Sequence, residues 1–430
     1  MYKPTTFLLD GLRNAFPKQL FPWDDYFARM AETDFLSGRA YVPAVKSFFM
    51  RQAPFGGSYA LLGGMVAALR GMADVYFDDP NFKAGMLDMG YRPEFVAWLA
   101  SRENLRLKVY APPEGSIIFP NEPIITVTGS LVDVRFAEGI ITEAVNFATL
   151  SLTKWHRLVR VVRPGTVLEF SRRRAQNSHK ASLYAMLAGC SFTSNSEIRR
   201  FFSVPVTGTM GHEWMQSFGD IRQAFKIWLD YQPGKPVGLV DTKQCLEHDF
   251  PIWLDEVWNH RDAIKTANPP FWGWRNDSGD LAYLTIEQYV RFMKHPLASD
   301  EWFCDKMRLV LTNDLDEYSA AAIIQQIRAQ AGEAGFNAED ILRRIIWAAG
   351  TKPGTCDDQP SLGGVAKLME ADGAACLKLA FDAEGRPGVK TSIPGFNFSA
   401  IVRDGAGEAK TLLIYPAHKY NICKGKLCES

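Results

Sequence analysis

The chain has 430 residues, 47% of them hydrophobic, which is enough for two or three domains with large cores. Lysine plus arginine and aspartate plus glutamate stand at 48 each, so no overall charge draws the chain to nucleic acid or to a membrane surface. The apolar run near the N-terminus is too short for a signal peptide, and no stretch reaches membrane-spanning length. We therefore expect a cytoplasmic globular protein. Seven scattered cysteines without a C-x-x-C pair favour free thiols over disulfides or a cysteine-based zinc site.

The first part of the chain predicts a mixed α+β domain over residues 1–140. Tyr26 and Met30 share one face of a predicted helical turn. A second helix is predicted from a cap near Ser58 to about Arg70. Strand-like runs broken by prolines follow at 105–110 and 124–128. A long helix over 139–162 is apolar around much of its circumference, which indicates burial, and we place the domain boundary near its start.

After Pro164 the pattern becomes a short apolar strand, a polar strand end and then a helix, repeated along the chain. Helices are predicted at 220–230 and 317–329. Seven such repeats favour a parallel α/β barrel. The predicted strands lie near Val167, Phe192, Val206, Leu239, Trp272, Leu309 and Ile345.

Basic, amide and imidazole groups follow the first three of these strands, where α/β folds carry their chemistry. Three arginines directly after Phe170 and Ser171 suit a flat anionic ligand, because guanidinium binds carboxylate or phosphate and a ring face stacks on a heterocycle. A solvated charge cluster is the alternative interpretation. Asn195 follows the second strand and His212 the third. A lone histidine at such a place is more often structural than catalytic.

The later strand ends carry carboxylates and turns. Asp241 follows one strand, and Arg275, Asp277, Ser278 and Gly279 follow the next, a set suited to ribose hydroxyls and a phosphate. An N-capped turn with solvated charges is the alternative. Two further strand ends suit phosphate, because backbone N–H groups at helix starts and Gly-rich turns hold anions. These phosphate candidates are Thr312, Asn313, Asp314, Gly350 and Thr351.

Taken together, the segments EFSRRRAQ, TSN, GTMGHEW and RNDSGD, in this order and spacing, resemble the nicotinate phosphoribosyltransferase family. The resemblance implies an irregular seven-stranded parallel α/β barrel of the type II phosphoribosyltransferase kind over residues 141–375. It also implies a second α+β domain built from 1–140 and completed by about 376–430. The chain departs from the family at Ser171, usually glycine, at Gly211, more commonly alanine, and in the loop after Thr351.

The resemblance implies a reaction that joins nicotinate to 5-phosphoribosyl 1-diphosphate, coupled to ATP hydrolysis through phosphorylation of His212. Glu213 or Asp241 is expected to orient the imidazole. Mg²⁺ is expected as counter-ion of the diphosphate, although no metal ligand is assigned. The expected partners are nicotinate, phosphoribosyl diphosphate and ATP.

The family further implies that the pyridine ring stacks between Phe170 and Tyr26 of a neighbouring subunit, in a homodimer with shared sites. Arg173 and Arg275 are expected to hold its carboxylate, while Asp277 and Asp241 face the ribose. Asn195 is expected to set the preference for nicotinate, since nicotinamide-using relatives carry an aspartate there. A nicotinamide phosphoribosyltransferase and a catalytically silent barrel that binds a pyridine nucleotide are the alternatives.

Overall fold

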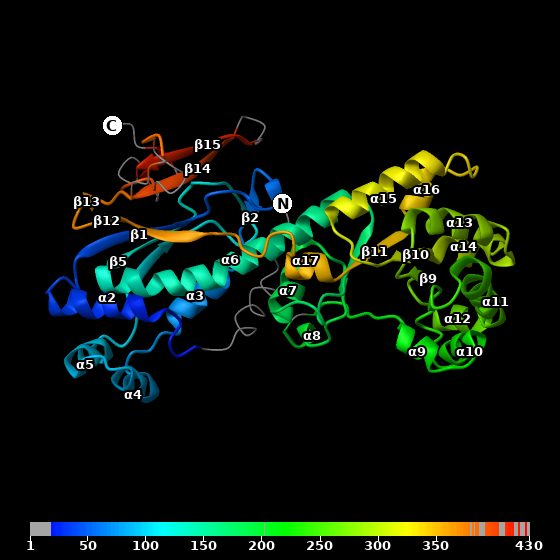
Figure 1. Ribbon diagram of the computed structural model, residues 1–430, viewed down its shortest axis with the longest axis horizontal. Helices are drawn as coiled ribbons and strands as arrows, with labels where there is room; N and C mark the ends of the chain where they lie inside the picture. The colour runs from blue at the N-terminus through cyan, green and yellow to red at the C-terminus, as the bar shows by residue number, and fades with distance from the viewer. Residues whose placement is uncertain are drawn as a thin grey trace. The chain divides into compact units, whose positions relative to one another are not determined.

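The computed structural model describes residues 19–201, 203–378, 381, 383–386, 392–403, 409–416, 420–421 and 426–427 (Figure 1). The chain forms two compact units. Unit 1 is Met1–Thr153 with Gln359–Ser430, and unit 2 is Lys154–Asp358. No helix in these described ranges is both long enough and apolar enough to cross a bilayer.

Unit 1 is built on a five-stranded antiparallel sheet of order β13-β12-β1-β5-β3. Its strands are β1 (Pro43–Phe49), β3 (Leu107–Tyr110), β5 (Ile125–Ser130), β12 (Val365–Ala371) and β13 (Ala374–Ala375). Side chains alternate between its faces. Val45 and Phe49 of β1 pack with Met369 of β12, whereas Lys46 points the other way and its Nζ lies 2.6 Å from Glu138 of a long helix. The predicted strands at 105–110 and 124–128 are thereby confirmed as β3 and β5.

The remaining elements of unit 1 cover this sheet. Helices α2 and α6 run along one of its faces and the β14/β15 hairpin lies over the other (Figure 1). The helices are α2 (Asp25–Leu36), η1 (Pro54–Gly56), α3 (Met65–Ala73), α4 (Pro80–Asp88), α5 (Pro93–Ser101) and α6 (Leu131–Val161), whose last turns belong to unit 2. The short strand pairs are β2 (Ala60–Leu61) with β4 (Ile117–Ile118), β14 (Asn397–Arg403) with β15 (Ala409–Pro416), and β16 (Tyr420–Asn421) with β17 (Lys426–Leu427).

Helix α3 begins at Met65 and not near Ser58, which corrects the sequence prediction. The residues between 58 and 65 do not form a helix, because 60–61 pair as a strand and Gly64 adopts a φ of +89°. A Cβ on Gly64 would lie 2.2 Å from the Ala144 carbonyl oxygen of α6, so only glycine lets the two segments approach this closely. The Glu114 carboxylate then accepts from the N–H groups of Gly64 and Val66, at 2.5 and 3.0 Å, and caps α3.

Unit 2 contains a six-stranded, wholly parallel sheet of order β7-β6-β11-β10-β9-β8, which confirms the parallel α/β architecture. The strands are β6 (Thr166–Glu169), β7 (Phe192–Thr193), β8 (Val237–Leu239), β9 (Trp272–Asn276), β10 (Met307–Leu311) and β11 (Ile345–Ala349). The seventh predicted strand is wrong: Val206 forms only an isolated parallel bridge to Thr193. Pro205 has no N–H to donate to a ladder, which limits pairing here, and β8 pairs only with β9 among the described strands.

Helices connect these strands. They are α7 (Ser178–Ala188), α8 (Ile198–Phe201), α9 (His212–Gln216), α10 (Ile221–Tyr231), η2 (Cys245–Asp249), α11 (Phe250–Asn259), α12 (Arg261–Ala267), α13 (Leu281–Met293), η3 (Pro296–Ser299), α14 (Glu301–Lys306), α15 (Glu317–Gln330), α16 (Ala338–Leu342) and α17 (Thr351–Thr355). Helices α10 and α15 confirm the predictions at 220–230 and 317–329. On β9, Trp272 and Trp274 are fully buried and donate from Nε1 to Phe303 of α14 and Gln288 of α13. Of the residues predicted from sequence, Tyr26 lies on α2 in unit 1, His212 and Glu213 lie on α9, and the others lie at or just after the carboxyl ends of the strands of this sheet.

Candidate functional site

His212 is the first residue of α9 and stands beside the carboxyl end of β8. Its Nε2 lies 3.7 Å from Asp241 Oδ1 and 3.7 Å from Asp277 Oδ2, and its Nδ1 lies 3.3 Å from the Thr242 hydroxyl. The imidazole is partly open to solvent, with 37% of its side chain exposed. Two carboxylates on one nitrogen favour a proton on Nε2, which leaves the Nδ1 lone pair facing Thr242.

Asp241 is the buried member of this group, with a side chain 3% exposed. Its Oδ2 accepts from the Asp277 N–H and the Ser278 hydroxyl, both at 2.7 Å. Its Oδ1 is also buried but accepts no hydrogen bond from the described residues. A buried carboxylate oxygen without a hydrogen bond lowers the stability of the fold. We therefore expect Oδ1 to accept a hydrogen bond from the nearby imidazole N–H or to contact a bound ligand.

Arg275 connects the ends of β9 and β10. Its NH2 lies 2.9 Å from Asp277 Oδ1, its Nε donates to the Thr312 hydroxyl at 3.1 Å, and its NH1 donates to the Thr209 hydroxyl at 3.1 Å. Its guanidinium carbon lies 5.9 Å from the centre of the Phe170 ring. The structure thus brings Phe170, which follows β6, to the strand end that carries Arg275 and Asp277.

The two predicted phosphate loops follow β10 and β11. Asn313 and Asp314 are exposed and have φ angles of 96° and 47°. In the other loop, a Cβ on Gly350 would lie 2.9 Å from the Phe170 carbonyl oxygen, so this position favours glycine. Lys352 connects the loops, because its Nζ lies 3.2 Å from Asp316 Oδ2 at the start of α15. Thr351 begins α17.

The side-chain amide of Asn195, which was predicted to set the preference for nicotinate, contacts other protein groups in the structure. The residue is fully buried and its amide is used inside the protein: Nδ2 donates to Ser182 Oγ at 3.1 Å and to the Ser178 carbonyl at 3.4 Å, while Oδ1 accepts from Arg172 NH1. Arg173 is exposed, and its side chain forms no hydrogen bond or ion pair with the part of the chain that the structure describes.

Three other predicted residues are exposed. Glu213 is exposed and its carboxylate contacts no donor among the described residues, so Asp241 and not Glu213 lies beside the imidazole. Gly279 has a φ of +79°, as its turn requires. Tyr26 lies on α2 in unit 1, where it is 53% exposed and packs on Phe27 with ring centroids 4.0 Å apart.

Sequence reasoning missed several positioning groups. Thr242 contacts His212, and Thr209 contacts Arg275. Thr242 directly follows Asp241, and Thr209 lies three residues before His212, so their positions in the sequence could have identified them. Beneath β9, the side-chain amides of Asn276 and Gln288 bond each other at 2.7 and 3.0 Å. No sequence signal pairs these two. Cys245 contacts the same amides, and burial raises the pKa of its thiol to about 12, which disfavours the thiolate.

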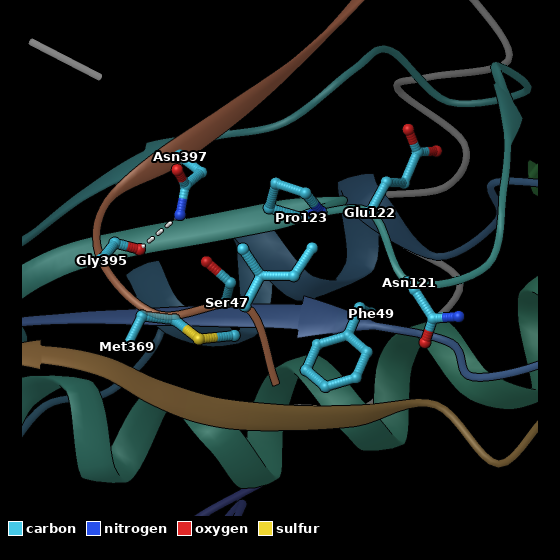
Figure 2. A pocket seen from close by; sticks show the side chains of 9 residues that line it. Ser47, Phe49, Asn121, Glu122, Pro123, Met369, Gly395 and Asn397 are labelled. Atoms are coloured by element: carbon cyan, nitrogen blue, oxygen red, sulfur yellow. Dashed lines mark hydrogen bonds between the residues drawn. The ribbon is translucent and has the colours of Figure 1, made fainter. Parts of the chain in front are cut away.

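Two other features lie outside this constellation. Within the described ranges, no cluster of three or more His, Cys, Asp or Glu side chains has the geometry of a metal site. Figure 2 shows a hollow in unit 1, lined by Phe49, Pro123 and Met369 among others. The Asn397 amide at its edge donates to the Gly395 carbonyl at 3.0 Å. None of the predicted site residues lines this hollow.

Comparison with known proteins gives the family. Residues 23–146 match the model of the nicotinate phosphoribosyltransferase N-terminal domain. The chain is 32% identical to the nicotinate phosphoribosyltransferase of Bacillus subtilis over 355 residues, which cover 81% of this chain and 67% of that protein. It is 28% identical to the human enzyme of the same name over 423 residues, covering 86% and 74%.

Solved structures agree. The crystal structure of human nicotinic acid phosphoribosyltransferase superposes with a TM-score of 0.71 at 25% identity, covering 92% of this chain and 81% of that one. A nicotinate-nucleotide pyrophosphorylase from Pyrococcus furiosus shares the fold, with a TM-score of 0.62 at 17% identity, covering 98% and 87%. The chain belongs to the nicotinate phosphoribosyltransferase family.

Proposed function

We propose that this protein is a nicotinate phosphoribosyltransferase. It joins nicotinate to 5-phosphoribosyl 1-diphosphate, releases nicotinate mononucleotide and diphosphate, and consumes ATP through a phosphorylated His212. The product is a precursor of NAD. The observation that carries the proposal is the setting of His212, with Asp241 and Asp277 on one ring nitrogen and Thr242 on the other, in a chain of this family.

The phosphoryl step uses the Nδ1 lone pair. Nε2–H faces two carboxylates, which would repel an incoming anionic phosphoryl group at that nitrogen, whereas Nδ1 faces a neutral hydroxyl. Nδ1 forms the bond to the γ-phosphorus of ATP as the bond to the leaving ADP oxygen breaks. The ring then carries a positive charge, and Asp241 holds the Nε2 proton in place. Water later accepts the phosphoryl group and returns the imidazole to its starting form.

In the transfer step, the pyridine nitrogen forms a bond to ribose C1 as the bond from C1 to the diphosphate oxygen breaks. Diphosphate leaves with the bonding electrons. Asp241 and Asp277 are the carboxylates nearest to His212 and stabilise positive charge that develops on the ribose. Ser278 and Gly279 flank the same turn. The phosphates are assigned to the two loops, at Thr312 to Asp314 and at Gly350 and Thr351.

The ring substrate is assigned to the end of β6. Phe170 supplies a stacking face beside Arg275, and Arg173 extends the positive charge of this end. Tyr26 of a second copy of the chain completes the sandwich in a homodimer, an assignment that the family resemblance and the exposed Tyr26 ring support.

Mg²⁺ fits this site chemically. It is usually bound by one or two carboxylates together with substrate phosphates, and the buried Oδ1 of Asp241 accepts no hydrogen bond from the described residues, so this oxygen is open either to the metal or to the imidazole N–H but not to both at once. Asp241 and Asp277 are the residues that would hold it. The ion supplies charge neutralisation for the diphosphate leaving group.

The deciding experiment offers nicotinate, nicotinamide and quinolinate side by side to the purified protein with 5-phosphoribosyl 1-diphosphate, ATP and Mg²⁺. Release of diphosphate and formation of the mononucleotide are measured together. We expect nicotinate to have the highest kcat/KM by at least about tenfold. A preference for nicotinamide would establish the nicotinamide enzyme instead. Tight binding without diphosphate release from any of the three would establish a silent binding protein.

A further inference from the structure

A pair of buried side-chain amides closes the base of the turn that carries Asp277. The turn lies between the end of β9 and the start of α13, and the residues that flank it, Asn276 on β9 and Gln288 on α13, are both fully buried. Asn276 Nδ2 donates to Gln288 Oε1 at 2.7 Å, and Gln288 Nε2 donates to Asn276 Oδ1 at 3.0 Å. This reciprocal pair fixes the strand to the helix on the two sides of the turn.

The orientation of both amides is determined by chemistry. The indole N–H of Trp274 can only donate, and it donates to Gln288 Oε1 at 2.8 Å, which places the Gln288 NH2 on the other side. This NH2 donates to Asn276 Oδ1 and also to Cys245 Sγ, at 3.1 Å. The network therefore specifies one arrangement, because a flipped amide at 288 would set its NH2 against the indole N–H.

Helix α13 also holds the segment that follows β8. Cys245, the partner of the Gln288 NH2, begins η2 four residues after Asp241. One turn further along α13, Arg291 NH1 donates to a backbone carbonyl of η2 at 2.6 Å. Gln288 therefore contacts both of the chain segments that carry the carboxylates Asp241 and Asp277.

Thr312, which follows β10, connects Asn276 to the carboxylate of Asp277. The Asn276 carbonyl accepts from the Thr312 N–H at 2.9 Å, and the Thr312 hydroxyl lies 3.0 Å from the same carbonyl. That hydroxyl donates to Asp277 Oδ1 and accepts from Arg275 Nε at 3.1 Å. Asp277 Oδ1 is thus held by Thr312 and by Arg275 NH2, which leaves Oδ2 on the side of His212.

We propose that Gln288 is a positioning residue for the phosphoribosyl transfer, which acts through Asn276 and Thr312 to hold the Asp277 carboxylate beside His212. This inference rests on the proposed function and adds to it a residue that is fully buried and touches no substrate. A shift of the turn would displace every catalytic group that it carries. Displacement by about 1 Å from a change far from the chemistry can lower the rate by about 100-fold.

The first test compares Gln288→Met, which keeps the length of the side chain but removes the amide, with Tyr289→Leu. Tyr289 is the next residue of α13. It is also buried and packs on Phe336 with ring centroids 5.1 Å apart, so its truncation destabilises the same helix and leaves the amide pair intact. The Tm of both variants is measured, and the kinetics are compared well below the lower Tm.

Gln288→Met should lower kcat by about 10- to 100-fold. Its KM for nicotinate should change by less than about threefold, because the ring substrate is assigned to the end of β6. Tyr289→Leu should change kcat by less than about twofold, since lost stability alone does not move a catalytic group. An unaltered kcat in Gln288→Met, or an equal loss of kcat in the two variants, would mean that the amide pair serves stability alone.

The second test is a double-mutant cycle of Gln288→Met with Thr312→Val, which removes the hydroxyl between Asn276 and Asp277. If Gln288 acts through Thr312, its substitution lowers the single-turnover rate in the wild-type background but by less than about twofold further in Thr312→Val. Equal factors in both backgrounds, or a Thr312→Val variant with the wild-type rate, would overturn this route.

Hydrogen exchange, followed by mass spectrometry without substrate, separates the inference from the proposed function. The Thr312 and Asp277 N–H groups donate to the Asn276 carbonyl and to Asp241. In Gln288→Met, peptides that contain them should exchange at least about tenfold faster relative to peptides of β6, and in Tyr289→Leu this ratio should not change. Wild-type protein that releases no diphosphate with nicotinate contradicts the proposed function. Wild-type turnover together with unaltered exchange and kcat in Gln288→Met contradicts the role of Gln288.

Discussion

At the scale of single residues, His212 shows what the sequence predicts and what only the fold can add. The motif around it identifies the imidazole, and the spacing of Asp241 and Asp277 places carboxylates at neighbouring strand ends. Sequence order, however, favours Glu213 as much as Asp241 for the orienting group. The fold distinguishes the two carboxylates. Glu213 is exposed in the first turn of α9, whereas the buried Asp241, just after β8, lies beside Nε2 of His212. Contacts between strand ends far apart in the chain decide the assignment.

This difference predicts the behaviour of two conservative variants. Incubation with γ-labelled ATP should give an acid-labile, base-stable phosphoprotein, and His212→Asn should abolish the label. Asp241→Asn should lower the rate of labelling by about 10- to 100-fold, by analogy with the carboxylates that orient metal-binding histidines. Glu213→Gln should change it by less than about twofold. Labelling that persists in His212→Asn, or that depends on Glu213 and not on Asp241, would refute the assignment.

At the scale of elements, two segments that depart from the family pattern lie against each other in the fold. Ser171 stands where the family usually has glycine, and Gly354 lies in the divergent loop after Thr351. In the fold they touch: a Cβ on Gly354 would lie 2.2 Å from the Ser171 Cβ. The Ser171 side chain at the end of β6 occupies the space that a side chain at position 354 of α17 would need. Sequence alone presents these as unrelated, because the contact joins the first and last strands of unit 2.

The pair predicts a non-additive effect on stability. Gly354→Ala should lower the free energy of unfolding by about 1–3 kcal/mol through overpacking against Ser171. Ser171→Gly should cost about 1–3 kcal/mol, because the buried Glu169 loses a hydroxyl donor. The double variant should be more stable than the sum of the two losses by at least about 1 kcal/mol, measured by urea unfolding. Additive losses would show that the two side chains do not share the space.

At the scale of the whole molecule, the sequence predicts the class of each unit better than its boundaries and its strand count. Apolar runs and polar strand ends identify the parallel sheet, yet Val206 forms one bridge and no strand, because backbone pairing depends on partners that periodicity does not report. Helix α6 begins at Leu131, before the predicted 139, and contributes to both units. Its close contact with Gly64 and α3 makes the cap at Glu114 important for the stability of unit 1.

Glu114 therefore gives this stability a pH dependence. Burial raises the pKa of its carboxyl to about 7 from 4.5, against the opposing effect of the backbone N–H groups of Val66, Gly64 and Met65. Because the folded-state pKa is raised, the stability contributed by this group is fully present below pH 4.5 and is lost as the pH rises through 7. The loss amounts to about 3 kcal/mol, at about 1.4 kcal/mol for each pKa unit. Glutamine at 114 does not titrate.

The free energy of unfolding of wild type minus that of Glu114→Gln should thus decrease steadily between pH 5 and pH 8. Other titrating groups cancel in this difference, since both proteins share them. Glu94→Gln is the matched control for the loss of a carboxylate as such, because Glu94 lies in the first turn of α5 with an exposed side chain. A Glu114→Gln difference that changes no more with pH than that of Glu94→Gln would mean that the three N–H donors outweigh burial and keep the carboxylate ionised, so that α3 is held on α6 by a charged cap throughout this pH range.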